Sequence, residues 1–100
     1  MFEREADGHY RLRADLTFAT VAELRPRGLA ALAAAAPAAP LTFDLAGARL
    51  ADSAGLALLV DWVAAARARG TPLRFSGLSP ELRALARLSD VEDLVATPAG

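Results

Sequence analysis

A chain of 100 residues, 54% of them hydrophobic, can pack one core, so we expect one domain over 1–100 with a frayed C-terminal tail from about residue 96. Its net charge of −1 and its scattered arginines indicate neither nucleic acid nor an anionic membrane surface as a partner. The absence of Cys excludes disulfides and zinc–thiolate sites, and the absence of Lys excludes Schiff-base and P-loop lysine chemistry.

The remaining titratable groups offer no reaction centre. His9 is the only histidine, lies in a predicted strand and cannot form a two-histidine metal site. We therefore predict a non-enzymatic protein with no catalytic residue, no metal and no cofactor. No segment reaches the roughly 18 consecutive apolar residues of a membrane span, and Met1–Glu5 lacks the apolar core of a secretory signal. The expectation is a cytoplasmic protein that does not insert into a membrane.

The N-terminal segment has the pattern of a β-hairpin. Apolar and polar residues alternate from His9 to Leu16, which is typical of a half-buried strand. A second strand over Phe2–Ala6 is expected to pair with it across the turn Asp7-Gly8, because Asp-Gly is a strong hairpin signal.

A helix is expected over residues 21–36. Thr20 and Glu23 have the spacing of a capping box, and apolar residues then recur at helical intervals. Pro26 lacks the N–H group that a helix interior needs. The helix therefore begins near Arg25, or its first turn is kinked at Pro26.

Strands and helices alternate in the rest of the chain. The pattern predicts strands at 41–45 and 72–76 and helices at 53–69 and 79–89. Residues 90–94 are expected to form a short helix or an edge strand. Gly70 is expected to end the first of these helices, and Ser79 with Pro80 is expected to begin the second. Strands joined through helices indicate an α/β domain with a partly parallel sheet.

The segment Asp52-Ser53-Ala54-Gly55-Leu56 places a hydroxyl group at a predicted helix start. Because the first turn of a helix has free N–H groups and a partial positive charge, a phosphate on Ser53 would be well received. Unmodified, Asp52 or Ser53 would cap the same turn. Capping is favoured over a catalytic pair of Asp52 with Asp44, because no second activated group accompanies them. Gly55 lowers helix propensity, which we interpret as room for close approach by another backbone or by a partner.

The same helix carries a second apolar face. Its core stripe is expected to consist of Leu56, Leu59, Val60, Val63 and Ala66. Leu58, Trp62 and Ala65 fall together, about 120° or more from the centre of that stripe. Trp62 is therefore half-buried at an edge or part of a partner-binding face. The second alternative predicts that Trp62→Ala weakens partner binding and leaves the melting temperature nearly unchanged.

A strand and a helix start carry a resemblance to a known family. Leu41-Thr42-Phe43-Asp44-Leu45, followed by Asp52-Ser53-Ala54-Gly55-Leu56, resembles the STAS domain, in which a strand ending in Asp-Leu precedes Asp-Ser/Thr-x-Gly-Leu at a helix start. This family includes anti-sigma factor antagonists and the cytoplasmic ends of sulfate transporters. Residues 52–59 and the segments 75–78 and 82–88 look most like the small STAS subunit of the Mla phospholipid ABC transporter. The resemblance covers essentially the whole chain and implies a mixed sheet of four to five strands with three to four helices.

The resemblance also implies a partner. The Mla-type subunit is non-catalytic and docks on the cytoplasmic ATPase subunit, which would place this chain at the inner membrane through its partner. The expected contact residues are Asp52, Ser53, Ala54, Gly55, Leu56, Leu58 and Trp62. In anti-sigma factor antagonists the equivalent serine is instead phosphorylated by a partner kinase, so phosphorylation of Ser53 by an anti-sigma factor kinase is the alternative. Ala14 departs from the Gly that many relatives have before the acid at Asp15, which loosens any inference about the loop that follows.

Overall fold

The computed structural model describes residues 1–96. These residues contain β1 (Phe2–Ala6), β2 (His9–Leu12), α1 (Val21–Ala34), β3 (Leu41–Asp44), α2 (Ser53–Ala68), β4 (Leu73–Ser76), α3 (Pro80–Leu88) and α4 (Glu92–Val95). The segment after residue 90 is thus helical, one of its two predicted alternatives. Apart from residue 96 itself, the predicted frayed tail lies outside the described residues.

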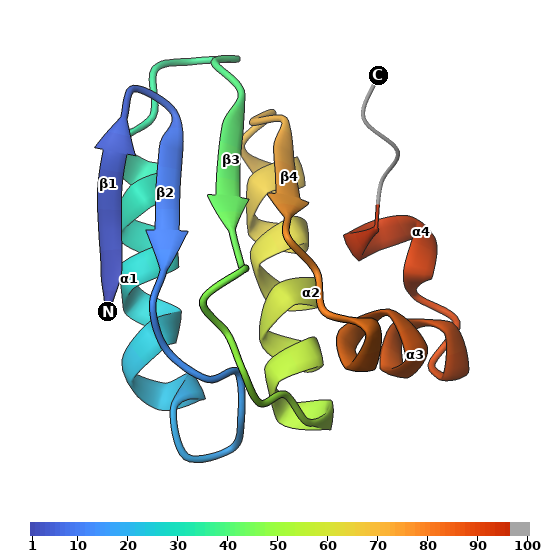
Figure 1. Ribbon diagram of the computed structural model, residues 1–100. Helices are drawn as coiled ribbons and strands as arrows, with labels where there is room; N and C mark the ends of the chain where they lie inside the picture. The colour runs from blue at the N-terminus through green and yellow to red at the C-terminus, as the bar shows by residue number, and fades with distance from the viewer. Residues whose placement is uncertain (97–100) are drawn as a thin grey trace.

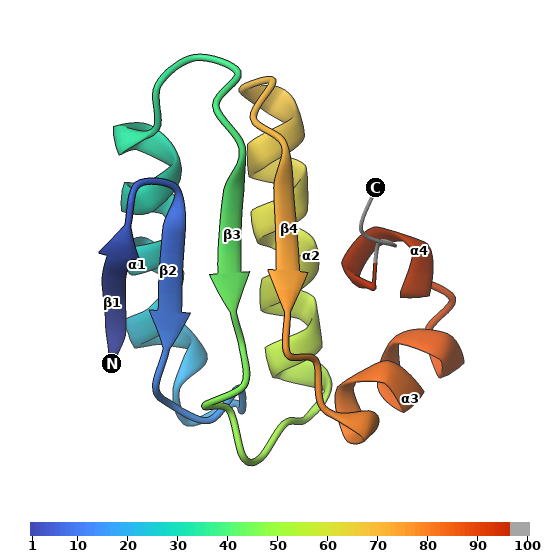
Figure 2. The same ribbon diagram turned by 45° about the horizontal axis from the view of Figure 1, so that its top comes forward.

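The four strands form one mixed sheet in the order β1-β2-β3-β4. β1 and β2 are antiparallel, whereas β3 runs parallel to both β2 and β4. α1 and α2 cover one face of the sheet, and α3 and α4 lie beyond the β4 edge (Figure 1). Because each parallel strand leads into a helix, the starts of α1, α2 and α3 gather at the carboxyl ends of β2, β3 and β4 (Figure 2). The predicted α/β class with a partly parallel sheet is confirmed.

The core lies between the sheet and the two covering helices. Phe43 of β3 meets Trp62 of α2 edge to face, with ring centroids 5.4 Å apart, and lies 6.1 Å from Phe75 of β4. Trp62 has no exposed surface, and its indole N–H donates to the carbonyl of Arg25 at 3.2 Å. α1 approaches closely at Gly28, where a Cβ atom would overlap the indole ring. These contacts join both helices to the sheet.

The other face of the sheet, turned towards the viewer in Figure 1, is not covered by α1–α4 and is polar. Arg11 of β2 pairs with Glu5 of β1 at 2.7 Å and with Asp44 of β3 at 3.6 Å. Arg13 pairs with Glu3 at 2.8 Å. Each of these side chains is at least a third exposed, so each pair contributes at most about 1 kcal/mol.

β2 is shorter than its alternating pattern predicts. It ends at Leu12, and beyond that point Leu16 forms a single parallel bridge with Ala51. The neighbouring strand β3 ends at Asp44, so the chain after Leu12 has no strand beside it. The segment from Arg13 onward is therefore a loop that runs over the end of the sheet.

The helix predicted over residues 21–36 begins at Val21, as expected, and ends at Ala34. Pro26 is exposed within it, so the alternative start near Arg25 is wrong. Thr20 does not cap through its side chain. Its hydroxyl donates to the Asp15 carbonyl at 2.6 Å and accepts from the Thr17 amide at 3.1 Å. The capping-box prediction fails because the preceding loop already occupies this hydroxyl.

Candidate functional site

Residues 52–56 lie at the carboxyl edge of the sheet, where α2 begins (Figure 2). The loops that follow β2 and β3 meet there. The amide of Leu16 donates to the carbonyl of Leu50 at 2.9 Å, and the amide of Asp52 donates to the carbonyl of Leu16 at 3.0 Å. The carboxylate of Asp15 accepts from the amide of Leu50 at 3.1 Å. The two loops and the first turn of α2 therefore form one hydrogen-bonded unit.

Asp52 is the N-cap of α2. One carboxylate oxygen accepts from the amides of Ala54 at 2.9 Å and Gly55 at 3.1 Å, and the other accepts from the amide of Phe18 at 3.0 Å. The Phe18 amide, followed by the two helix amides, holds the pKa of the Asp52 carboxyl below its usual value. The ionised carboxylate thus caps α2 and also fixes the loop before α1.

Gly55 is a point of close approach between α2 and the loop after β2. A Cβ atom at Gly55 would overlap the carbonyl group of Leu16. The close approach predicted for this glycine is therefore made by the chain's own backbone. Gly55 is buried and is not available to a partner.

Ser53 is exposed at the first position of α2. Because Asp52 already accepts from the amides of Ala54 and Gly55, a phosphate on Ser53 would compete with a carboxylate for them. The two negative groups would also repel each other. The helix start therefore offers a phosphate fewer free amides than the sequence suggested. The site offers an exposed hydroxyl on a rigid, already capped turn.

Two large apolar side chains are exposed on the same loops. Phe18 is 82% exposed and Leu50 is 64% exposed. Neither residue was predicted as a site residue, because a single apolar residue in a loop has no periodicity to reveal its role. The available signal was their position after predicted strands, since functional residues collect at the carboxyl ends of parallel strands.

Comparison with known families places these features in context. The sequence model of the family described as "Mlab, STAS domain" matches residues 3–96. The chain belongs to this STAS domain family. A search of curated protein sequences finds no match for it.

Several solved structures share the fold of this STAS domain. The anti-sigma factor antagonist SpoIIAA in its unphosphorylated form matches with a TM-score of 0.71 and 18% identity, over 95% of this chain and 84% of its own. A sulfate transporter family protein from Wolinella succinogenes matches with a TM-score of 0.67 and 18% identity, over 85% of this chain and 67% of its own. The murine anion transporter Slc26a9 matches with a TM-score of 0.66 and 16% identity, over 89% of this chain but 14% of its own. At these identities the similarity shows the STAS fold alone.

Three of the predicted contact residues of this STAS domain belong to its core. Leu56 is 4%, Leu58 3% and Trp62 0% exposed. α2 packs against α1 and also against α3 and α4, so its flanks are covered as well as its sheet-facing side. The predicted docking face through Leu58 and Trp62 is therefore wrong. Of the predicted contact residues, only 52–54 keep exposed surface.

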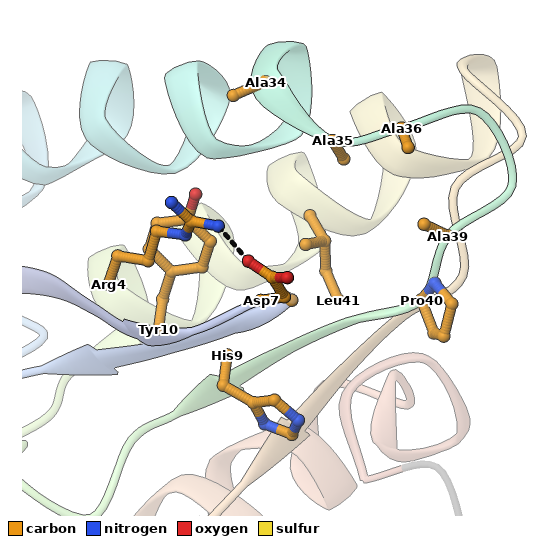
Figure 3. A pocket seen from close by; sticks show the side chains of 11 residues that line it. Arg4, Asp7, His9, Tyr10, Ala34, Ala35, Ala36, Ala39, Pro40 and Leu41 are labelled. Atoms are coloured by element: carbon orange, nitrogen blue, oxygen red, sulfur yellow. Dashed lines mark hydrogen bonds and ion pairs between the residues drawn. The ribbon is translucent and has the colours of Figure 1, made fainter.

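A cavity of about 610 Å³ lies at the opposite end of the STAS domain, between the β1–β2 hairpin and the end of α1 (Figure 3). Alanine side chains and Pro40 form one wall, and Arg4 pairs with Asp7 on the other. His9 points away from this ion pair. Within residues 1–96, no group of three or more His, Cys, Asp or Glu side chains could hold a metal ion. The same residues include no helix of the length and apolarity that crossing a bilayer requires.

Proposed function

We propose that this chain is a non-catalytic STAS subunit that binds the cytoplasmic ATPase of a phospholipid ABC transporter and supports its activity. The observation that carries this proposal is the exposed Ser53 on a turn that the chain itself has fixed through Asp52. The family description, which names Mlab, supports the choice of partner. The chain would work in the cytoplasm without a cofactor, at the inner membrane only through its partner.

The contact would be built around residues 52–54. Ser53 offers a hydroxyl that can donate and accept a hydrogen bond, and Ala54 beside it is too small to obstruct an approaching backbone. Gly55 and Leu56 act from behind the surface, because they seat the first turn of α2 on the loop and the core. A rigid turn loses little conformational entropy on binding, which favours docking.

A second candidate is an anti-sigma factor antagonist that is switched by phosphorylation of Ser53. The exposure of the hydroxyl favours it, because a kinase could reach the side chain without unfolding the helix. A phosphate there would lie close to the Asp52 carboxylate and would add about two negative charges to the docking surface. Such a change would break binding by repulsion.

Reconstitution with the purified ATPase subunit tests the proposal. Ser53→Glu should weaken association by about tenfold or more and reduce ATPase activity, because it adds a charge at the contact. Ser53→Ala should have a smaller effect on both. Ser89→Glu is the matched control, since Ser89 is an exposed serine at the end of α3. Equal binding and activity for both Ser53 variants would refute a role for this site.

The second candidate predicts a different result in the same assay. An anti-sigma factor kinase supplied with ATP would phosphorylate wild-type protein but not Ser53→Ala. Stable association with that kinase and no association with the ABC ATPase would favour the antagonist function.

A further inference from the structure

The two exposed apolar side chains at the carboxyl edge of the sheet have no role within the fold. Phe18 is 82% exposed and Leu50 is 64% exposed, and neither belongs to the hydrophobic core. The loops that carry them meet at the start of α2, beside the exposed Ser53 (Figure 2). Large apolar side chains gathered at one end of a molecule mark an interaction site more often than single scattered ones do.

Hydrogen bonds hold the backbone at both residues. The Leu50 amide donates to the carboxylate of Asp15 at 3.1 Å, and its carbonyl accepts from the amide of Leu16 at 2.9 Å. The Phe18 amide donates to the carboxylate of Asp52 at 3.0 Å. These bonds oppose a rearrangement that would turn the side chains inward. The exposed apolar area is therefore preorganised for binding.

The charges around this pair indicate what would cover it. Arg49, next to Leu50, is exposed and has no ion-pair partner among residues 1–96, whereas Asp15 and Asp52 already accept backbone amides. One free arginine beside two carboxylates suits a single acidic group on a protein. An anionic lipid surface would instead select a cluster of unpaired basic residues, whereas among the described residues of these two loops only Arg49 is unpaired, since Arg13 pairs with Glu3.

We propose that Phe18, Leu50 and Arg49 form a docking surface for a partner protein that presents an apolar groove bordered by an acidic residue. The apolar side chains enter the groove, and Arg49 pairs with the acid at its edge. This proposal rests on the proposed function only for the identity of the first partner to test. The surface extends the contact from the Ser53 hydroxyl to a larger apolar area, which supplies most of the binding energy.

The test measures the affinity of the full chain for the purified ATPase subunit of the transporter. Phe18→Ser and Leu50→Ser should each weaken binding by about tenfold or more, because apolar anchors dominate the energy of a contact. Arg49→Glu should also weaken binding, because the variant can no longer pair with the acidic residue of the partner. The melting temperature of each variant should stay near that of the wild type, since these side chains are exposed. Leu88→Ser is the matched control, because Leu88 is 85% exposed at the end of α3, beyond the β4 edge (Figure 1).

The possible outcomes separate this inference from the proposed function. If the wild type binds the ATPase and Phe18→Ser and Leu50→Ser bind equally well, the inference is overturned and the function stands. If the wild type binds only an anti-sigma factor kinase and the same variants lose that binding, the function is overturned and the inference stands. Binding to neither protein overturns both. An equal loss for Leu88→Ser, or Phe18-dependent sedimentation with vesicles of phosphatidylcholine and phosphatidylglycerol, also overturns the inference.

Discussion

Two neighbouring residues at the start of α2, Asp52 and Ser53, have different environments. The carboxylate of Asp52 is directed to the chain itself, where it accepts from three backbone amides. Ser53 is exposed and makes no side-chain hydrogen bond within residues 1–96. The acid can therefore hold the surface in shape while the hydroxyl remains available to a partner.

Trp62 allows a test of stability at a single residue. Trp62→Ala should lower the free energy of unfolding by about 3–5 kcal/mol, because it removes a large buried side chain and leaves a cavity. Urea denaturation followed by circular dichroism measures the loss. Leu88→Ala, at an 85% exposed leucine, should change the same quantity by less than about 0.5 kcal/mol. A Trp62→Ala protein with unchanged stability and weakened partner binding would restore the docking-face interpretation.

Sequence periodicity did not predict the full burial of Trp62, because it left this residue at a half-buried edge or on a partner-binding face. Of the predicted core stripe, Val60 is only partly buried against the core. The other four residues are buried: Leu56, Leu59, Val63 and Ala66. A helix packed on three sides has apolar residues around most of its circumference, and a helix with a core face and a docking face has the same pattern. The partners that cover the flanks of α2 come from distant parts of the chain, so only the tertiary structure decides.

At the scale of elements, the loop after β2 and the first turn of α2 are joined through one side chain. Because the folded-state pKa of Asp52 is lowered, its contribution to stability is fully present above the ordinary aspartate pKa of about 3.9. This contribution is lost as the pH falls through the lower pKa of the folded state. The loop that carries Phe18 should therefore loosen at acidic pH before the core unfolds.

An acid titration followed by nuclear magnetic resonance tests this coupling. The amide proton of Phe18 should shift as Asp52 takes up a proton below about pH 3.9. In Asp52→Asn the side-chain oxygen can still cap α2, but no carboxylate faces the Phe18 amide, so the acid-dependent shift should disappear. The same acid shift in both proteins would show that another group controls this loop.

Element ends with local signals were predictable, and those set by distant contacts were not. The Ser79 side chain accepts from the Leu82 amide at 3.1 Å, and Pro80 opens α3, both as predicted. Gly70, with φ of 70°, follows α2 as a terminal glycine should. The alternation beyond Leu12 was misleading because β3 ends at Asp44, so that segment forms a single bridge, at Leu16, and no continuous strand. Strand pairing depends on a second chain segment, which a local pattern does not contain.

The whole molecule has a covered face and an open face. All of the helices lie behind the sheet or beyond its β4 edge, and the open face carries exposed ion pairs between β1, β2 and β3 (Figure 1). Most of the folding stability therefore comes from the apolar core, because the exposed ion pairs of the open face contribute little to it.

Salt offers a test of this division. Raising NaCl from about 0.05 M to about 0.5 M should change the melting temperature by less than about 2 °C, because screening acts mainly on pairs that are already exposed. Sodium sulfate should raise the melting temperature, since it strengthens apolar burial. Differential scanning calorimetry measures both. A large fall in NaCl would mean that the open-face pairs carry substantial stability.

The fold as a whole was predictable because the order of strands and helices and the sequence motif both indicate the same fold. Alternating strands and helices indicated the α/β class, and the motif at 41–45 and 52–56 indicated the family. Of the proposed docking surface, the sequence pointed to Asp52, Ser53 and Ala54, because the helix start supplies a local signal there. Phe18 and Leu50 lie on two loops that come together only in the folded sheet. Their exposure therefore depends on tertiary contacts and could not be predicted from the local sequence.

The burial of Trp62 has a practical consequence, because it is the single tryptophan of the chain. Its indole ring is fully enclosed between Phe43 and α1, about two and a half turns along α2 from the exposed serine. Intrinsic fluorescence is thus a built-in optical probe of core integrity that is remote from the proposed contact surface. Titrations with a partner can be monitored at a separate label while tryptophan emission reports, in the same cuvette, whether the domain is still folded.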